Sequence, residues 1–269
     1  MNEKLNSLSN STTAIAVFDI DGVIRDVGGS YRRAIADTVE HFTAKAFRPS
    51  PTDIDNLKSE GIWNNDWEAS QELVYRYFEA QGKTRSEVAL DYQQLIDFFQ
   101  SRYQGPDPTN WTGYICDEPL LLSASYLESL TQAGIGWGFF SGAPRAEAAY
   151  VLQGRLGIES PVLVAMEDAP GKPDPTGLFA SVRQLEGESA DNLTPVIYAG
   201  DTVADMLTVQ KARLLQPSRR WVAVGILPPH LINLGERRDI YTDKLREAGA
   251  EVILSNVQEL TVNKIREIL

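Results

Sequence analysis

The 269-residue chain is poor in the side chains that form disulfides and transition-metal sites. It contains one cysteine, Cys116, and two histidines, His41 and His230. A single cysteine excludes an internal disulfide and makes a cysteine-based zinc site untenable. Neither histidine has a metal-binding partner at ligand spacing, so we predict structural or surface positions for both.

The chain also lacks long apolar runs and an excess of positive charge. No apolar run approaches the ~18 residues that span a bilayer, and residues 1–13 lack the apolar centre of a secretion signal. There are 25 lysines and arginines against 37 aspartates and glutamates, which gives a formal net charge of −12. Nucleic-acid binding relies on basic side chains, so this acidic balance predicts no nucleic-acid partner. The lack of long apolar segments predicts a soluble cytoplasmic protein without a membrane partner. The oligomeric state stays open.

The order of apolar segments predicts an α/β fold. Residues 14–18 (AIAVF) are continuously apolar, as is typical of a strand that is buried on both faces. Beyond residue 112, short apolar runs such as PVLVAM, PVIYAGD, WVAVGIL and AEVILS alternate with helix-period segments, the last of which spans 257–269. This alternation predicts a doubly wound parallel sheet of the Rossmann-like type.

A long helical segment interrupts that pattern. Helix-period apolar positions recur over 29–47, with Ser30 as a plausible cap, and over 53–60, 67–82 and 86–105. We therefore expect a disordered tail over 1–13, a catalytic core built from 14–26 plus 113–269, and an inserted all-helical cap over 27–112.

Chemically active side chains follow the predicted strands. Ligands of open parallel sheets bind at the carboxyl ends of the strands. The residues at these ends are Asp19 and Asp21, Ser141 and Gly142, Lys172, and Asp201 with Asp205. Each has a structural alternative when taken alone. For example, Asp201 could cap the next helix with Asp205 on its solvated face. Their joint occurrence at one sheet edge favours a functional site.

These residue types suit phosphoryl transfer. Carboxylates can hold Mg²⁺, which would relieve the repulsion between Asp19 and Asp21. Ser141, neighbouring backbone N–H groups such as that of Gly142, and Lys172 can bind phosphoryl oxygens. One carboxylate can attack phosphorus while a second moves the proton.

The segments FDIDGVI, FFSG, GKPDP and AGDTVADM resemble, in this order, the four signature motifs of the haloacid dehalogenase superfamily. The residues around these motifs are similar to those of the phosphatase branch, whose members carry a helical cap between motifs one and two. This resemblance implies Mg²⁺-dependent hydrolysis of a small phosphate monoester through an aspartyl phosphate. The name-giving dehalogenases lack the second aspartate and need no Mg²⁺, so Asp21 favours a phosphatase.

The resemblance also implies a role at each matching position. Asp19 would be the nucleophile and a metal ligand. Asp21 would be the general acid/base and would bind the metal through its backbone carbonyl. Asp201 would ligate the metal directly, and Asp205 would support it through water or Lys172. Lys172 would also bind the phosphoryl group, together with Ser141 and Gly142.

The substrate is predicted only as a class: a phosphosugar, a phosphorylated polyol or a phosphoglycolate-like acid. Specificity would reside in the cap, where candidate residues are Arg32, Arg33, Asn65, Asp66 and Trp67. Each of these five residues could instead be packed in the cap or solvated on its surface, without a role in specificity.

Two other functions remain open from the sequence. A phosphomutase similar to β-phosphoglucomutase would share Asp19 and Asp21 and return the phosphoryl group to a bound sugar. A non-catalytic ligand-binding or regulatory protein on the same fold is the alternative of another class. The intact acid set argues against the second alternative, since a sensor needs no leaving-group acid.

Overall fold

The computed structural model describes residues 12–58, 60, 62–63, 65–187, 193–232 and 234–269. The predicted disordered tail therefore lies almost entirely outside the described residues. The remaining chain divides into two compact units. We call the residues up to Asp26 together with Leu120–Leu269 the core unit, and Val27–Pro119 the helical unit. Each unit is described by itself.

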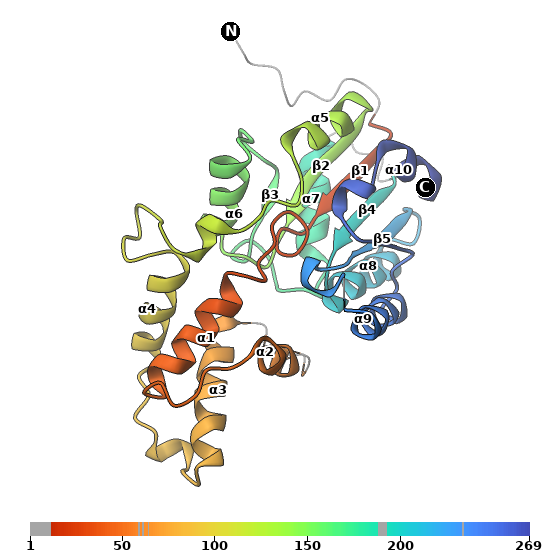
Figure 1. Cartoon of the computed structure of the whole chain (residues 1–269). Coiled ribbons are helices and arrows are strands. Elements are labelled where there is room, and N and C mark those ends of the chain that lie inside the picture. Colours follow the sequence, from red (N-terminus) through yellow and green to blue (C-terminus); the bar gives the residue numbers. More distant parts are fainter. Residues whose placement is uncertain (1–11, 59, 61, 64, 188–192, 233) are drawn as a thin grey trace. The chain divides into compact units, whose positions relative to one another are not determined.

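The core unit contains a six-stranded sheet in which all neighbouring strands are parallel (Figure 1). The strands are β1 (Ala14–Phe18), β2 (Ile135–Phe140), β3 (Leu163–Val164), β4 (Val196–Gly200), β5 (Trp221–Ile226) and β6 (Val252–Leu254). Their order is β3-β2-β1-β4-β5-β6, in which the chain winds outward from β1 in both directions. This is the doubly wound arrangement that the sequence predicts.

Helices cover both faces of the sheet. One face packs against α5 (Ala124–Gln132), α6 (Arg145–Ala149), the π-helical turn η3 (Tyr150–Arg155) and α10 (Val262–Ile268). The other packs against α7 (Thr176–Glu186), α8 (Val203–Leu215) and α9 (Glu236–Glu247). Along β1, Ala16 and Phe18 enter the first cluster and Ile15 and Val17 enter the second, because successive side chains point to opposite faces. Burial on both faces explains why the β1 segment is continuously apolar.

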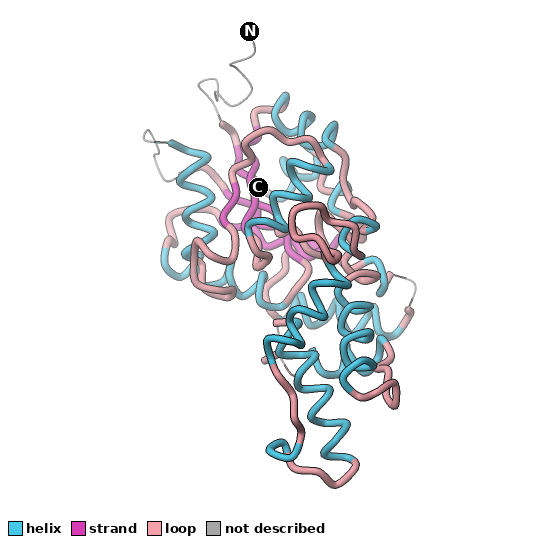
Figure 2. Tube along the Cα trace, turned by 90° about the vertical axis from the view of Figure 1, so that its left-hand side faces the viewer, coloured by secondary structure: helices cyan, strands magenta, loops and turns pink. Residues whose placement is uncertain are grey.

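The helical unit is built from α1 (Tyr31–Phe42), α2 (Pro51–Lys58), α3 (Asp66–Ala80) and α4 (Tyr92–Tyr103), with short 3₁₀ turns η1 (Arg85–Glu87) and η2 (Tyr114–Asp117). Helix α1 packs against α3 and α4. Figure 2 shows helix and loop but no strand over the described part of this unit. Buried Val39, Leu73 and Phe99 contribute to its interior.

The predicted helix over 86–105 is wrong in its first part. Residues 85–87 form the 3₁₀ turn η1, and the α-helix begins only at Tyr92. Thr84 and Glu87 form a capping box around η1, and the Asp91 side chain accepts a hydrogen bond from the Gln94 N–H at the start of α4. These polar side chains offer the backbone local partners that compete with a continuous helix.

The predicted helix over 257–269 is likewise interrupted. It is a 3₁₀ turn, η6 (Val257–Glu259), followed by α10, and Asn256 and Thr261 cap these two elements. Ser30 precedes α1 as predicted, but its side chain makes no cap hydrogen bond. Its hydroxyl instead contacts the Glu118 carboxylate and the Val27 carbonyl.

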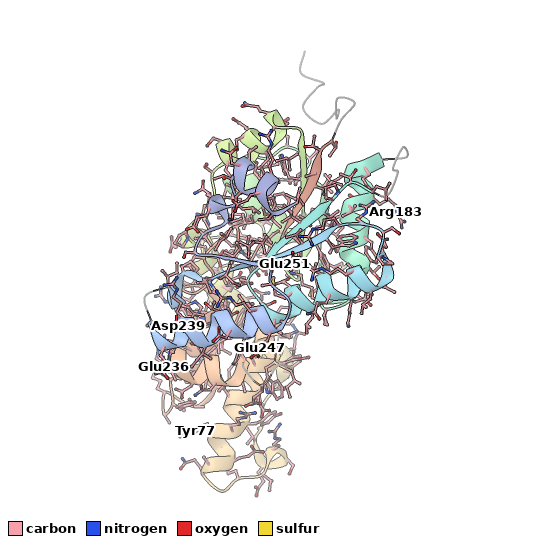
Figure 3. All side chains as sticks on the ribbon, turned by 90° about the vertical axis from the view of Figure 1, so that its right-hand side faces the viewer. Tyr77, Arg183, Glu236, Asp239, Glu247 and Glu251 are labelled. Carbon is pink, nitrogen blue, oxygen red and sulfur yellow. The ribbon has the colours of Figure 1, made fainter. Side chains whose placement is uncertain are left out.

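Helix α9 carries exposed charges of both signs on the surface of the core unit, with Arg237, Arg238, Lys244 and Arg246 among its acidic residues. Glu236, Asp239 and Glu247 lie along α9, where all three are exposed (Figure 3). Among the described residues, no helix combines the length and the apolar composition needed to cross a bilayer.

Candidate active site

The pairing of β1 with β4 brings the two main acidic segments together. Phe18 is in register with Ala199, and the Asp19 N–H donates to the Ala199 carbonyl at 2.9 Å. Asp19 and Asp201 therefore leave adjacent strands at the same carboxyl edge. This edge lies where the strand order reverses, which is the position at which doubly wound sheets bind ligands.

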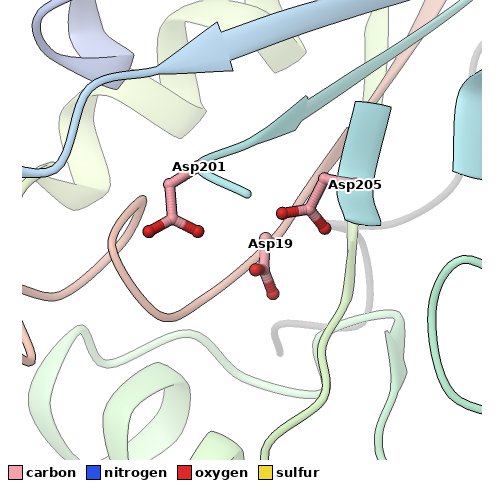
Figure 4. A group of neighbouring side chains, drawn as sticks. All are labelled: Asp19, Asp201 and Asp205. Carbon is pink, nitrogen blue, oxygen red and sulfur yellow. The ribbon is translucent and has the colours of Figure 1, made fainter. Parts of the chain in front are cut away.

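Three carboxylates converge at this edge (Figure 4). One oxygen from each of Asp19, Asp201 and Asp205 lies within 4.8 Å of the other two. Asp19 is 6% exposed and Asp205 is fully buried. The structure thus brings together three of the four acids predicted to serve the metal.

Lys172 connects two of these acids. Its Nζ lies 2.9 Å from Asp19 Oδ1 and 2.7 Å from Asp205 Oδ1, and its side chain is only 10% exposed. The ammonium group also lies 5.3 Å from the ring centroid of Phe140 and 5.5 Å from that of Tyr198. The lysine is therefore a buried part of the acidic cluster and not a solvated loop residue.

Asp205 is held by donors on both oxygens. Oδ1 accepts from the Tyr198 hydroxyl at 2.9 Å in addition to Lys172, and Oδ2 accepts from the N–H and hydroxyl of Thr202 at 2.9 and 2.6 Å. Thr202 is the N-cap of α8, and its hydroxyl accepts from the Asp205 N–H. The alternative in which Asp201 caps this helix and Asp205 is solvated is therefore wrong.

The carboxylates differ in their proton affinity. Burial raises the pKa of Asp19 to about 7; Lys172 opposes this shift, while the charges of Asp205 and Asp21 add to it. Burial and the neighbouring charges of Asp19 and Asp205 raise the pKa of Asp201 well above its usual range. For Asp205, burial works in the same direction, but Lys172 and Thr202 outweigh it and lower the pKa.

This electrostatic pattern fits a cation site. Burial is the largest cause of the raised pKa values of Asp19 and Asp201, and repulsion by neighbouring carboxylates, which Lys172 opposes, adds to it. A hard divalent cation that prefers oxygen ligands, such as Mg²⁺, would remove that repulsion. Asp19 and Asp201 are the residues that would hold it.

Asp21 has a different partner. Its side chain is 40% exposed, and its Oδ1 accepts a hydrogen bond from Arg25 Nε at 2.6 Å. The group of three carboxylates does not include it. Arg25 is a residue that the sequence analysis did not single out, because a lone arginine after a predicted turn carries no distinguishing signal.

In the segment after β2, Ser141 is buried and Gly142 is exposed. The Ser141 N–H donates to the Val164 carbonyl at 3.0 Å, and its Oγ accepts from the Ala143 N–H at 3.0 Å. Its hydroxyl hydrogen is therefore not used in that bond. Gly142 is exposed, and in the described part of the chain no atom beyond its neighbours in sequence lies within 4 Å of where a Cβ would stand. A ligand oxygen can thus approach this backbone closely.

Two further residues fix the position of Asp201 and were also missed. Gly22 has a φ of +73°, and a Cβ at this position would stand 2.0 Å from Asp201 Oδ2. The Tyr241 hydroxyl donates to the Asp201 carbonyl at 2.7 Å. The glycine directly after Asp21 was a visible signal, whereas Tyr241 lies forty residues from its partner.

The five candidate specificity residues all have partners within the helical unit. Arg32 pairs with Asp55, and Asp66 pairs with Lys58. The Arg33 guanidinium stacks over the Tyr114 ring. Asn65 caps α3 by accepting from the N–H groups of Trp67 and Glu68, and Trp67 itself is half-buried. Their role in specificity stays a prediction.

Comparison with known proteins agrees with this architecture. One curated relative, named imidazoleglycerol-phosphate dehydratase, from Phytophthora nicotianae, is 31% identical over 245 residues. The match covers 89% of this chain and 49% of the relative, so the chain spans about half the length of that protein.

Solved structures share the fold. A phosphonoacetaldehyde hydrolase-like protein from Oleispira antarctica aligns with a TM-score of 0.66 and 16% identity, covering 100% of this chain and 96% of the other. The phosphatase Tt82 from Thermococcus thioreducens aligns with a TM-score of 0.60 and 22% identity, covering 86% and 99%.

The family match extends over the sheet edge that carries the acids. It is to the haloacid dehalogenase-like hydrolases and covers residues 13–213, which include Asp19, Ser141, Lys172 and Asp201. The expectation of a hydrolase agrees with this match. The chain belongs to the haloacid dehalogenase-like hydrolase family.

Proposed function

We propose that the protein is a Mg²⁺-dependent phosphatase that hydrolyses a small phosphate monoester through an aspartyl phosphate on Asp19. The observation that carries this proposal is the buried cluster in which Lys172 bonds Asp19 and Asp205 while Asp201 closes the group of carboxylates. The proposed nucleophile Asp19, the ammonium group of Lys172 and the proposed Mg²⁺ site then lie together at one edge of the sheet.

The residues of the site divide the tasks of this reaction among them. Lys172, Ser141 and the Gly142 N–H bind the phosphoryl oxygens, which directs phosphorus at Asp19. The Asp19 carboxylate attacks phosphorus, and Asp21 gives its proton to the departing oxygen. In the second half, Asp21 accepts the proton of the water that cleaves the aspartyl phosphate.

The remaining acids serve the cation. When bound by Asp19, Asp201 and the backbone carbonyl of Asp21, Mg²⁺ would offset the negative charge of the carboxylates and of the phosphoryl oxygens. Asp205 keeps Lys172 in place between itself and Asp19. Four hydrogen-bond donors already engage the Asp205 oxygens, which favours this indirect role.

The substrate class follows from the same chemistry. We propose a small phosphorylated metabolite, with the helical unit acting as a specificity cap that includes Arg32, Arg33, Asn65, Asp66 and Trp67. The relative from Phytophthora nicotianae is named for a phosphorylated polyol that carries an imidazole ring. Phosphorylated polyols are therefore the first esters to test. The single cysteine suits a reducing cytoplasm, which we propose as the location.

The test is phosphate release across a panel of monoesters with and without Mg²⁺. The panel contains phosphosugars, polyol phosphates including imidazoleglycerol phosphate, and phosphoglycolate. We expect hydrolysis of at least one ester, loss of activity on chelation and its return with added Mg²⁺. Asp19→Asn should lower kcat by at least about a thousandfold, because it removes the nucleophile.

Three outcomes would contradict parts of the proposal. Equal, background-level hydrolysis by the unmodified protein and Asp19→Asn would remove the catalytic claim. Activity that survives chelation would remove the metal. Sugar-phosphate isomerisation without phosphate release would point to a phosphomutase instead.

A further inference from the structure

The loop after β1 holds Asp21 and Arg25 at a fixed separation. The Gly22 N–H donates to the Arg25 carbonyl at 2.9 Å, and the Arg25 N–H donates to the Ile20 carbonyl at 3.2 Å. Arg25 also forms isolated bridges with Asp21 and with Leu120. The backbone on which the Arg25 side chain stands is therefore tied down on both sides.

The Arg25 side chain is completely buried. Its exposed fraction is 0%, although an arginine carries a full positive charge at every ordinary pH. Its Nε donates to Asp21 Oδ1 at 2.6 Å, and its Nη2 lies 3.8 Å from Glu147 Oε2 in α6. Burying a charge is costly unless it is paired in good geometry. The guanidinium therefore has little freedom to move away from Asp21.

Asp21, in contrast, stands partly in solvent. Its side chain is 40% exposed, and a short carboxylate in that position would otherwise sample several rotamers. Its only hydrogen bond to a charged group in the described part of the chain is the one from Arg25. The buried side chain of Arg25 thus sets the orientation of the Asp21 carboxyl group.

We propose that Arg25 is a positioning residue for Asp21, holding the carboxyl group in the orientation needed for proton transfer to and from substrate. The inference rests on the proposed function, since it assigns Asp21 as the general acid/base. Arg25 itself touches neither the substrate nor phosphorus in this scheme.

The step in which the orientation matters can be written in full. The bond between Asp19 Oδ and phosphorus forms while the ester oxygen–phosphorus bond breaks. The proton of the Asp21 carboxyl group passes to the departing oxygen, which leaves as an alcohol, and Asp21 is left as a carboxylate beside Arg25. In the second half, one proton of the attacking water returns to Asp21 as the Asp19–phosphorus bond breaks.

Esters that differ in their leaving group separate this role from a structural one. An alkyl phosphate needs a proton on its departing oxygen, whereas p-nitrophenyl phosphate releases a stable phenolate without one. kcat/KM reports the steps up to release of the leaving group, so it isolates the proton donation by Asp21. The readout is the ratio of kcat/KM for the best alkyl ester of the panel to that for p-nitrophenyl phosphate.

We expect Arg25→Met to lower kcat/KM for the alkyl ester by about tenfold to a hundredfold, as misplacement of a catalytic group does. The value for p-nitrophenyl phosphate should change by less than about threefold, because that ester needs little help from the acid. Asp21→Asn should shift the ratio in the same direction and further. Arg25→Lys should restore part of the ratio, since it keeps the charge but not the planar fork.

The matched control is Arg219→Met. Arg219 is an equally buried arginine that pairs with Glu186 at 2.9 Å, and it lies just before β5, at the other end of the strands. It should lower stability without changing the ratio. Should Arg25→Met prove too unstable, Arg25→Met/Glu147→Gln removes the carboxylate left behind, and the same ratio is measured.

An unchanged ratio, or a rise in kcat/KM for the alkyl ester, would overturn the positioning role. A rise would mean that Arg25 restrains Asp21 instead of directing it. These results differ from failure of the proposed function itself, which would appear as inactivity of the unmodified protein on both esters. If Asp21→Asn left the ratio unchanged, the acid/base assignment would fail, and the positioning role would fall with it.

Discussion

In the active site, Gly22 leaves the space that the Asp201 carboxylate occupies. Gly22 adopts a φ of +73°, a conformation that is strained for any side chain, and its Cα faces the Asp201 carboxylate. Asp201 can reach the group of three carboxylates only because position 22 carries no Cβ.

Gly22→Ala should therefore displace Asp201. We expect a loss of about a hundredfold in kcat/KM, because the carboxylate must move by more than an ångström. The free energy of unfolding should fall by about 1–3 kcal/mol owing to the positive φ. Steady-state kinetics over a range of Mg²⁺ concentrations should show a weaker apparent affinity for the metal.

Gly82→Ala is the matched control for backbone strain. Gly82 has a φ of +83°, and among the described residues no atom beyond its chain neighbours lies within 4 Å of its would-be Cβ. It lies in the helical unit, just after α3. The Gly82→Ala variant should have a lower free energy of unfolding, because it too places a side chain at a positive φ. Its activity should keep the same dependence on Mg²⁺. Full activity in Gly22→Ala would show that Asp201 tolerates displacement.

At the scale of single residues, the sequence reveals the acids better than their partners. Asp19 and Asp201 are recognisable because each follows a strand whose end is clear from its composition, and Asp205 lies four residues beyond Asp201. Arg25, Tyr198 and Tyr241 are not recognisable, since their contacts depend on where side chains meet across the fold. The functions of Asp19, Asp21 and Lys172 remain predictions until they are tested.

At the scale of elements, the N-terminus of α8 supports the active site. Thr202 caps this helix, and its hydroxyl also donates to Asp205 Oδ2 at 2.6 Å. One side chain thus satisfies the helix end and helps to orient the carboxylate that holds Lys172. Helix stability and the geometry of the site are coupled at this point.

Thr202→Ala should therefore have two effects. The free energy of unfolding should fall by about 1 kcal/mol, which is typical for loss of a threonine N-cap. kcat should fall by about tenfold, because Lys172 loses part of the support that reaches it through Asp205. Urea unfolding and steady-state kinetics on the same preparation measure both.

Thr261→Ala separates these effects. Thr261 caps α10 by accepting from the Lys264 N–H at 3.2 Å, and α10 packs at the C-terminal end of the chain. It should cost similar stability while kcat stays unchanged. Equal kcat values for the two alanine variants would contradict the coupling at α8.

The elements themselves were predictable to different degrees. The strands were evident because a parallel sheet that is buried on both faces requires continuous apolar runs. The helix over 86–105 was not, because apolar periodicity continues through Val88 and Leu90 while Thr84 and Asp91 divide the segment. Local hydrogen bonding by capping side chains outweighed the periodic pattern.

At the scale of the whole molecule, the raised carboxyl pKa values link stability to pH. The native state holds the Asp19 proton with a pKa of about 7, against 3.8 for the free side chain, and Asp201 shifts in the same direction. Their protonated forms therefore stabilise the metal-free fold at low pH, and this contribution is lost as pH rises through about 7. The pKa of Asp205 is lowered, so the stability that its carboxylate contributes is lost only when the pH falls below the ordinary value of 3.8.

We expect Mg²⁺ to stabilise the protein more at about pH 8 than at about pH 5, since protons compete with the cation for the same oxygens. At a hundred times its Kd, Mg²⁺ should add about 2.7 kcal/mol to the free energy of unfolding. Thermal unfolding with Mg²⁺ or with a chelator at both pH values measures this difference. Asp201→Asn should abolish most of it, and an equal response of both proteins would exclude Asp201 as a ligand.

The position of Lys172 between Asp19 and Asp205 also determines which cations balance the site. When all groups are ionised, three carboxylates and one ammonium leave a net charge of minus two. A divalent cation would bring this sum to zero, whereas Na⁺ or K⁺ would leave a negative remainder that repels a phosphate dianion. Valence, more than ionic radius, would then decide which ions support turnover.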